Sequence, residues 1–247
     1  MAPPVLGDAF GTALRQCHAA GGATGSAVVV VERDDGWVSV ADVAPYLSGP
    51  DDWSAIEREM CERATGRVLD IGCGAGRHVL ALQARGVDAL GVDTSAGALA
   101  VCAERSAPAT AADVDALPAH LGRFDTFLML GWNLGFLSDQ RRAAAVLARL
   151  AQLANPGARV IGTGADPHLV EDEEHRAALE ANRRRGRLPG QMRMRIRFDR
   201  LATPFFDYLY CSPAELDALV GESPWRLSDV VPDEETGTYG AVLTLAG

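Results

Sequence analysis

The stretch Val68-Leu69-Asp70-Ile71-Gly72-Cys73-Gly74-Ala75-Gly76-Arg77 decides the fold of this protein. A short apolar run opens it, three glycines follow at alternate positions, and a helical spacing of Val79, Leu80 and Leu82 begins at once. This order predicts a buried strand, a tight turn and a helix N-terminus. Because glycine has no Cβ, a ligand can approach the turn closely, and the unpaired N–H groups of the helix start favour negative charge. The stretch therefore predicts a site for a nucleotide-type cofactor.

The spacing of the glycines distinguishes two classes of cofactor. A dinucleotide-binding turn has glycines at its first, third and sixth positions, but the sixth position here is Arg77. The pattern is instead Asp-x-Gly-x-Gly-x-Gly, which resembles motif I of the class I S-adenosylmethionine (SAM) methyltransferases. In that family the turn approaches the amino-acid and ribose parts of SAM, and the acidic residue helps to hold the methionyl ammonium. The resemblance implies SAM contacts at Asp70, Gly72, Cys73, Gly74 and Gly76.

Two further acidic segments extend the resemblance. The predicted strand 87–93 ends at Asp93, about 20 residues after the glycine turn, where a carboxylate can accept hydrogen bonds from both ribose hydroxyls. A helix N-cap is the competing role for this residue. Asp113 has the place of a family residue that receives the adenine amino group, and Asp115 competes with it for that role. The resemblance implies further cofactor contacts at Asp93, Thr94, Asp113 and Val114.

The run 124–130 is almost continuously apolar, which is typical of a parallel strand covered on both faces. Gly131, Trp132 and Asn133 follow it, at the edge where ligands bind in open α/β sheets. Trp132 and Asn133 are therefore expected to face adenine or the acceptor, and core packing is the alternative for Trp132. We assign Gly131 and Trp132 to the cofactor and Asn133 to the acceptor. Pro-Pro-Tyr or Pro-Pro-Phe does not follow Asn133, so the signature of DNA adenine methyltransferases is absent.

The predicted strand 158–164 leads to Asp166 and His168, at the sheet edge where the methyl group is transferred in the family. Methyl transfer is an in-line displacement at a cationic sulfonium, so the acceptor must be aligned and, where needed, deprotonated. His168 is the leading candidate for a base, and Asp166 can serve instead or orient the acceptor. A surface loop is the commoner location of such a histidine.

A charged helix is predicted over residues 171–185, followed by a strand over 191–198 that alternates cleanly. Its arginines, Arg193 and Arg195 among them, share one face and could bind a carboxylate or phosphate of the acceptor. The alternative is a solvated face balanced by the acidic residues 171–174.

Residues 203–210 are expected to pair back as an antiparallel strand, with Tyr208 as a possible acceptor contact. In the N-terminal segment, Tyr46 is the candidate contact of a lid, or else a partly buried loop residue.

Composition limits the remaining choices. The chain has 247 residues and a net charge of −10, and all of its 23 basic residues are arginine. This acidity argues against nucleic acid as a partner. No apolar run approaches the roughly 18 residues of a membrane span. Five cysteines without a Cys-x-x-Cys pair indicate reduced thiols in a cytoplasm and no zinc site.

The expected architecture is an α/β fold of the class I methyltransferase type. The resemblance implies a seven-stranded sheet whose last strand is antiparallel, with helices on both faces. We expect a lid and helix over 1–66, a SAM-binding core over 67–165, an acceptor-side insertion of a helix and a β-hairpin over 166–211, and a final helix and two strands over 212–247.

The expected function is methyl transfer from SAM to a small-molecule acceptor, with S-adenosylhomocysteine as the product. A SAM-fold protein that serves only as a binding or regulatory subunit is the alternative. Arg77 in place of the sixth-position glycine argues against a nicotinamide oxidoreductase. The sequence leaves open the acceptor, the atom methylated and the oligomeric state, for which a homodimer is one option.

Overall fold

The computed structural model describes residues 4–169, 172–233 and 235–246. The chain divides into two compact units, each built from segments distant in the sequence. The first unit comprises Met1–Trp53, Gly72–Asp113 and Arg193–Phe206, and the second comprises Ser54–Ile71, Val114–Met192 and Asp207–Gly247. The division falls after Ile71, so the strand before the glycine turn belongs to the second unit and the turn itself to the first.

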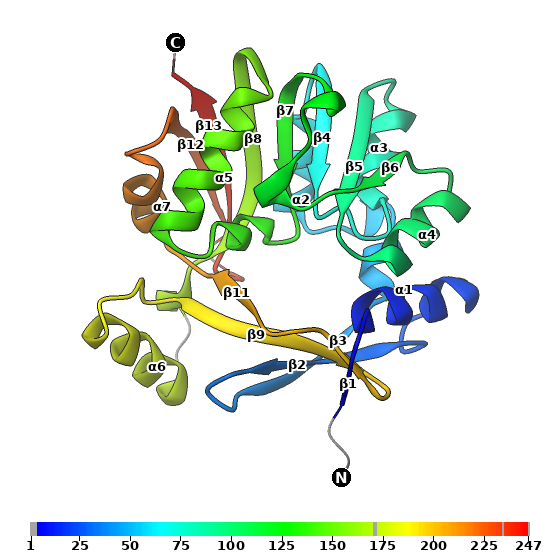
Figure 1. The fold of residues 1–247 in the computed structure, drawn as a ribbon, viewed down its shortest axis with the longest axis horizontal. Helices are drawn as coiled ribbons and strands as arrows, with labels where there is room; N and C mark the ends of the chain where they lie inside the picture. The colour runs from blue at the N-terminus through cyan, green and yellow to red at the C-terminus, as the bar shows by residue number, and fades with distance from the viewer. Residues whose placement is uncertain (1–3, 170–171, 234, 247) are drawn as a thin grey trace. The chain divides into compact units, whose positions relative to one another are not determined.

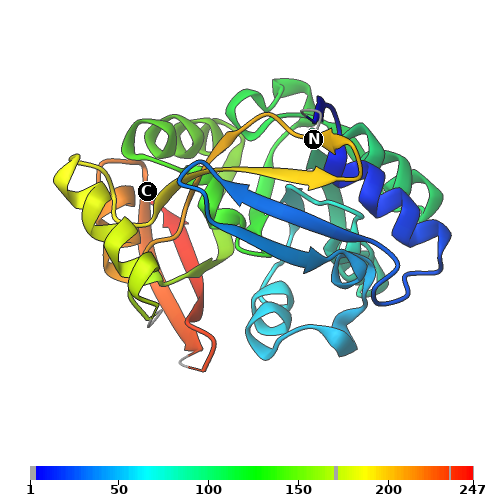
Figure 2. The ribbon, with the colours of Figure 1, turned by 90° about the horizontal axis from the view of Figure 1, so that it is seen from below.

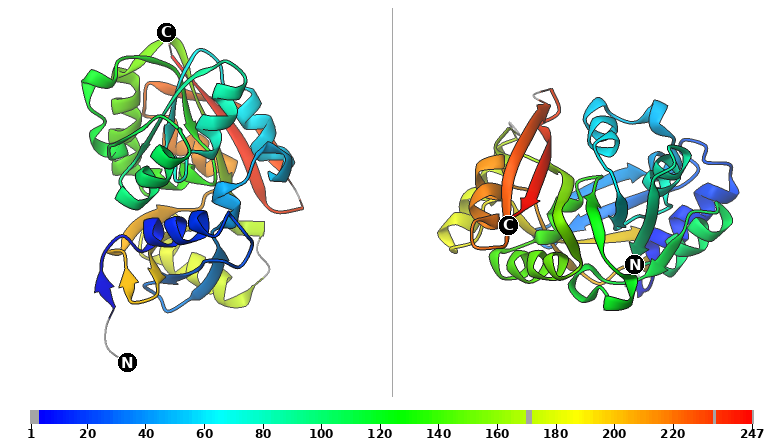
Figure 3. Two further views of the ribbon diagram at one scale, coloured as in Figure 1. Left: turned by 90° about the vertical axis from the view of Figure 1, so that its right-hand side faces the viewer. Right: turned by 90° about the horizontal axis from the view of Figure 1, so that it is seen from above.

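The strands of the second unit lie side by side in Figure 1: β4 (Arg67–Ile71), β7 (Phe124–Met129), β8 (Ala154–Ala165), β12 (Trp225–Asp233) and β13 (Thr238–Leu245). Both β4 and β8 pair in parallel with β7, and β13 pairs antiparallel with β8. The β12–β13 hairpin, visible in orange and red in Figure 3, completes this part of the sheet. The last strand of the chain is therefore antiparallel, as predicted.

The helices of the second unit are α2 (Ala55–Glu62), α5 (Gln140–Gln152), α6 (Glu173–Arg184) and α7 (Pro213–Val220). Helix α5 buries one face, and its Leu147 carbonyl accepts the indole N–H of the fully buried Trp225 at 2.8 Å. Helix α7 begins with the capping box that Ser212 and Glu215 form, which satisfies two backbone N–H groups at the helix start. Helix α6 begins at Glu173, and the predicted start at Glu171 lies outside the described residues.

In the first unit the glycine turn leads into α3 (Arg77–Ala84), β5 (Asp88–Asp93), α4 (Ala96–Glu104) and β6 (Ala109–Ala111). Strands β5 and β6 pair in parallel and extend the strand order to β12-β13-β8-β7-β4-β5-β6. Within the described residues the sheet is therefore mixed and has seven strands, which confirms the predicted fold class. The 3₁₀ turns η3 (Val114–Ala116), η4 (Ala119–Leu121), η5 (Asn133–Leu137) and η6 (Pro167–Leu169) lie in connections of the second unit.

A second sheet was not expected from the sequence. It contains β1 (Val5–Leu6), β2 (Val28–Arg33), β3 (Val38–Asp42), β9 (Gln191–Phe198) and β10 (Leu201–Ala202), in the order β1-β10-β9-β2-β3, and β11 (Phe206–Leu209) also pairs with β9. Figure 2 shows β2 and β3 in blue beside β9 in yellow. Strand β10 pairs antiparallel with β9. The predicted partner of β9, residues 203–210, contains β11, which also pairs with β9. However, β9 also pairs antiparallel with β2, so the insertion and the N-terminal segment form one sheet.

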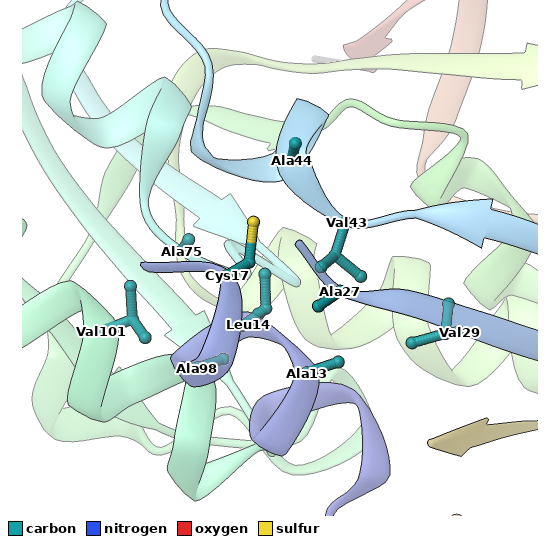
Figure 4. Packing of buried hydrophobic residues seen from close by; sticks show 10 residues of the cluster. All are labelled: Ala13, Leu14, Cys17, Ala27, Val29, Val43, Ala44, Ala75, Ala98 and Val101. Carbon is teal, nitrogen blue, oxygen red and sulfur yellow. The ribbon is translucent and has the colours of Figure 1, made fainter. Parts of the chain in front are cut away.

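Helix α1 (Ala9–Ala19) packs on this sheet and on α4. Figure 4 shows the cluster, in which Leu14 and Cys17 of α1 gather with Val29 of β2 and Val101 of α4. A Cβ at Gly97 would lie 2.5 Å from the backbone of Gly11, so α1 and α4 approach as closely as only small residues allow.

Among the described residues, no helix is both long enough and apolar enough to cross a lipid bilayer.

Candidate functional site: the glycine turn and the strand ends around it

The glycine turn, residues 72–76, has a backbone that only glycine adopts readily. Gly72, Gly74 and Gly76 have φ angles of 70°, 54° and 75°, in the left-handed region that other residues rarely enter. The amides of Gly72 and Cys73 both donate to the Val92 carbonyl, at 2.9 and 3.0 Å. These bonds hold the turn against the end of β5.

Gly74 and Gly76 serve different purposes in this turn. A Cβ at Gly76 would lie 2.6 Å from the Cβ of Ala107 and 3.1 Å from the Cys102 sulfur, so Gly76 allows α3 to begin close to neighbouring backbone. A Cβ at Gly74 would meet nothing within 4 Å, although the residue is buried. The space beside Gly74 is the kind of cradle that a cofactor at this turn requires.

Asp93 is bonded directly to the turn. Its carboxylate accepts the Gly74 N–H and the Ser95 N–H, both at 2.9 Å. The N-cap of α4 is Ser95, whose hydroxyl accepts the Ala98 N–H, so the competing N-cap role does not fall to Asp93. Burial raises the pKa of the Asp93 carboxyl, against the lowering effect of the N–H groups of Ser95 and Gly74.

Asp8 lies beside this site and was missed by sequence reasoning. Its carboxylate accepts the Gly11 N–H at 2.9 Å and so caps α1. The same carboxylate accepts the Ser95 hydroxyl at 2.9 Å and the Gly97 N–H at 2.8 Å. It also helps to raise the pKa of Asp93 through like charge. A local N-cap at Asp8 could have been read from the sequence, but the contacts with α4 could not.

Tyr46 lies in a segment that two arginines tie to the start of α3. This segment contains η1 (Ala44–Leu47) and η2 (Pro50–Asp52), and we call residues 44–53 the η1–η2 segment. The Arg77 guanidinium donates to the Pro45 carbonyl at 3.0 Å and lies 5.8 Å from the centre of the Tyr46 ring. Arg105 donates to the Ala75 carbonyl of the glycine turn at 2.7 Å and to the Leu47 carbonyl at 2.9 Å.

The other predicted cofactor residues fall on both units. Thr94 is exposed directly after β5, and Asp113 is exposed after β6. Asp70 is buried on β4 and Val114 is buried at η3. Asp115, the competitor of Asp113, pairs with Arg142 of α5 at 3.1 Å, which gives it a structural partner.

In the second unit the structure brings Trp132, Asn133 and Tyr208 together at the end of β7. The Tyr208 hydroxyl donates to the Trp132 carbonyl at 2.6 Å, and the Trp132 side chain is 44% exposed. Exposure at this level excludes plain core packing for Trp132. The Asn133 side-chain amide donates to the Ile71 carbonyl at 2.9 Å, and Ile71 directly precedes the glycine turn in the chain. Gly131 is exposed, with a φ of 66°.

His168 has partners at both ring nitrogens. Its Nε2 lies 3.0 Å from a Glu215 carboxylate oxygen, and its Nδ1 lies 3.3 Å from the Arg183 guanidinium. Because a guanidinium can only donate, Nδ1 is the acceptor and Nε2 carries the proton. Asp166 accepts the backbone N–H of His168 at 2.9 Å. The geometry favours a structural role for His168, which links α6, η6 and α7.

The arginines of β9 also have structural partners. Arg195 and Arg197 each donate to Glu32 of β2 at 2.6 Å, so the two guanidiniums share one carboxylate on the neighbouring strand. The Arg195 guanidinium also lies 4.8 Å from the Phe205 ring centre, and that of Arg193 lies 5.9 Å from it. The pairing favours the structural interpretation for Arg195. Sequence reasoning missed Glu32, because nothing local marks a partner on a strand so far away in the chain.

Comparisons with known proteins agree with this geometry. Residues 68–158 match the family model described as a methyltransferase domain. No protein of established description matches the chain in a sequence search.

Three solved structures illustrate the shared fold. A SAM-dependent methyltransferase from Bacteroides fragilis, solved in complex with S-adenosyl-L-homocysteine, superposes with a TM-score of 0.82 at 22% identity, over 97% of this chain and 95% of that one. SAM-bound CalS10 of Micromonospora echinaspora, an amino pentose methyltransferase, has a TM-score of 0.53 at 17% identity, over 80% and 94%. Streptomyces venezuelae DesVI has a TM-score of 0.56 at 16% identity, over 82% and 92%. The superpositions show that the chain has the fold of the class I SAM-dependent methyltransferases, and its residues 68–158 are similar to a methyltransferase domain.

Proposed function

We propose that this protein transfers a methyl group from SAM to a small-molecule acceptor. The observation that carries the proposal is the pairing of Gly74 with Asp93: an open glycine beside empty space, hydrogen-bonded to an acid at the end of the next strand. A carboxylate in this position can accept both hydroxyls of a ribose. The match to the methyltransferase family model and the SAM or S-adenosylhomocysteine bound in the neighbours support SAM as the nucleoside.

The predicted cofactor residues other than Trp132 receive a role in this proposal. The glycine turn, with Asp70 before it, holds the amino-acid part of SAM, and Asp93 with Thr94 holds the ribose. Asp113 and Val114 hold adenine; we favour Asp113 over Asp115 because Asp115 pairs with Arg142. Gly131 adjoins the cofactor, Asn133 fixes the strand end before the turn through the Ile71 carbonyl, and Tyr46 closes the site from the η1–η2 segment.

Bound SAM supplies an electrophilic methyl group on a cationic sulfonium. A lone pair of the acceptor forms the new bond to that methyl carbon while the carbon–sulfur bond breaks and its electron pair remains on sulfur. The protein aligns the two partners and excludes water. An acceptor that carries a proton must lose it, and we assign that proton to Asp166 in preference to His168, whose ring nitrogens are engaged by Glu215 and Arg183.

The proposed acceptor class rests on the charge of the chain and on one structural neighbour. The net charge of −10 disfavours nucleic acid, and CalS10, a structural neighbour, acts on an amino pentose. We therefore propose a soluble metabolite as the acceptor. Five buried free cysteines suit a reducing cytoplasm, where we expect the protein to act.

The test uses SAM labelled on its methyl group, the purified protein and an extract of the source organism, separated by size. Label in the small-molecule fraction supports the proposal and yields the product for identification. Label in protein or RNA would overturn the acceptor class and leave methyl transfer intact. Calorimetric titration with S-adenosylhomocysteine and NADH runs in parallel, and binding of NADH alone would overturn the cofactor assignment. Binding of S-adenosylhomocysteine without any labelled product would favour a binding or regulatory subunit.

A further inference from the structure

Trp132 has a strained backbone that three hydrogen bonds hold in place. Its φ and ψ are 65° and 17°, a left-handed conformation that is uncommon for a bulky residue and persists only where its surroundings impose it. Its amide donates to the Thr163 hydroxyl at 2.9 Å, and its carbonyl accepts the Tyr208 hydroxyl at 2.6 Å. Its indole N–H donates to the Thr238 hydroxyl at 3.3 Å. The ring is therefore fixed at both its backbone and its polar edge.

The ring so fixed is nevertheless exposed. The Trp132 side chain is 44% accessible, while the only polar atom of the indole is already engaged by Thr238. What the residue presents to a ligand is therefore apolar ring surface. An indole buried in the core on an unstrained backbone would be more stable than this exposed one. The strained backbone therefore indicates that the ring is held at the surface for contact with a ligand.

Three further aromatic rings continue from Trp132 in a chain of ring contacts, and we call the four residues the aromatic cluster. The Tyr210 ring packs edge to face on the Trp132 ring, with ring centres 6.0 Å apart, and on the Tyr208 ring, with centres 5.6 Å apart. The ring centres of Phe136 and Tyr208 are 5.8 Å apart. A Cβ at Gly135 would lie 2.3 Å from the Tyr208 ring, so the missing side chain of Gly135 makes room for this ring. The cluster is a packed wall that leaves Trp132 as its exposed member.

The cluster lies where an acceptor must come. Trp132 and Asn133 follow β7, and the Asn133 side chain bonds the Ile71 carbonyl, the last one before the glycine turn. Ligands of open α/β sheets bind beyond these strand ends.

We propose, on the basis of the methyl-transfer function above, that Trp132 is the platform on which the acceptor lies and that the acceptor carries an aromatic ring. An aromatic ring can stack on the indole without needing a polar partner. A polyhydroxylated sugar needs donors and acceptors, and the indole N–H and the Tyr208 hydroxyl are already used within the cluster. Polar groups buried without partners lose affinity, so the apolar surface of this wall suits an aromatic ring better than a polyhydroxylated ligand.

The test measures binding of 2-naphthol and of its saturated analogue decahydro-2-naphthol to the full chain, with and without S-adenosylhomocysteine. Trp132→Phe keeps a ring at the same strained backbone position, and Trp132→Leu keeps only apolar volume. Trp37→Leu is the matched control, because Trp37 is 46% exposed on the β2–β3 hairpin. Circular dichroism checks that each variant is folded.

We expect 2-naphthol to bind the wild type, Trp37→Leu and Trp132→Phe, and to bind Trp132→Leu about threefold to tenfold more weakly, the range of an aromatic pair. S-adenosylhomocysteine should bind all four proteins equally. If the saturated analogue binds the wild type as tightly as 2-naphthol does, the aromatic class is overturned. The same holds if a sugar probe, methyl glucosaminide, binds the wild type but not Trp132→Leu. Loss of S-adenosylhomocysteine affinity in Trp132→Leu would assign the ring to adenine instead. If S-adenosylhomocysteine fails to bind the wild type, the proposed function itself falls, and this inference with it.

Discussion

The amide of Gly74 donates to the carboxylate of Asp93 at 2.9 Å. Gly74, which borders open space, is thereby joined to the acid that ends β5. Because the bond fixes the carboxylate before any ligand arrives, less conformational entropy remains to be lost on binding. The relationship connects two sequence signals that lie far apart in the chain, and most of the predictions below depend on it.

Gly74→Ala should abolish cofactor binding because the added Cβ occupies the space of the ligand, an effect separate from the backbone strain. At a φ of 54° an alanine costs about 1–2 kcal/mol of stability, and its Cβ projects into the open space beside the turn. Gly21→Ala is the matched control, since Gly21 has a φ of 72° and also meets nothing within 4 Å. Both variants should unfold at lower urea concentration, but only Gly74→Ala should lose S-adenosylhomocysteine binding by calorimetry. Equal binding by both would contradict the cradle.

Asp93→Ala should weaken S-adenosylhomocysteine binding by at least about 1 kcal/mol, or roughly fivefold, the scale of a lost hydrogen bond to a charged group. Asp88→Ala, at the exposed opposite end of the same strand, is the control and should bind normally. The dissociation constants come from calorimetric titration. An unchanged constant in Asp93→Ala would sink the ribose assignment.

The affinity for S-adenosylhomocysteine should fall in acid as Asp93 becomes protonated. Burial raises the pKa of Asp93 above its ordinary value of 3.8, so the loss should begin at a higher pH than for an exposed aspartate. The same shift means that ionisation of this group costs stability: its contribution to folding is greatest below 3.8 and declines as the pH rises through the raised pKa. Titrations from pH 4 to 8 should show the dependence in the wild type, and Asp93→Asn should lack that component.

Glu32→Gln should destabilise the second sheet by about 1–2 kcal/mol at neutral pH, because Arg195 and Arg197 lose a charged acceptor. The hydrogen bond from Arg197, with that from Arg195, lowers the pKa of Glu32 below its ordinary value of 4.5. Its contribution is therefore complete above 4.5 and is lost as the pH falls through the lowered pKa. Urea unfolding of wild type and variant should converge in acid. Glu59→Gln, in an exposed pair with Arg63, should change little; an equal loss there would count against a special role for Glu32.

Arg105→Ala should loosen the η1–η2 segment from the glycine turn, because one guanidinium bonds both the Ala75 and the Leu47 carbonyls. We expect S-adenosylhomocysteine to bind severalfold more weakly and chymotrypsin to cleave faster after Tyr46. Arg105→Lys should recover part of the affinity, since an ammonium can replace one of the two bonds. Arg15→Ala, on the exposed face of α1, is the control. Unchanged affinity and proteolysis in Arg105→Ala would show that the segment holds without this contact.

The glycine turn and the acid that ends β5 could be placed in the fold from sequence because their signals are local. A strand, a tight turn and a helix leave their marks within ten residues, and the φ angles of Gly72, Gly74 and Gly76 are those that the pattern demanded. For this turn the chain's own periodicity and turn chemistry specify the structure. The antiparallel last strand was implied by the resemblance to the class I methyltransferases, and the structure confirms it.

The second sheet and the partners of individual side chains required the tertiary structure. Strand β2 pairs with β9, although most of the chain lies between them in the sequence. The pattern of a strand predicts which of its faces is buried but not which strand lies beside it. For the same reason the sequence did not predict that Glu32 pairs with Arg195, or that Asp8 accepts a hydrogen bond from the backbone at the start of α4. The sequence by itself determined a sheet with a glycine turn and an acid at the next strand end. Only the fold decided that His168 is held by Glu215 and Arg183 while Trp132 stands exposed, because hydrogen-bond partners distant in sequence are chosen by packing.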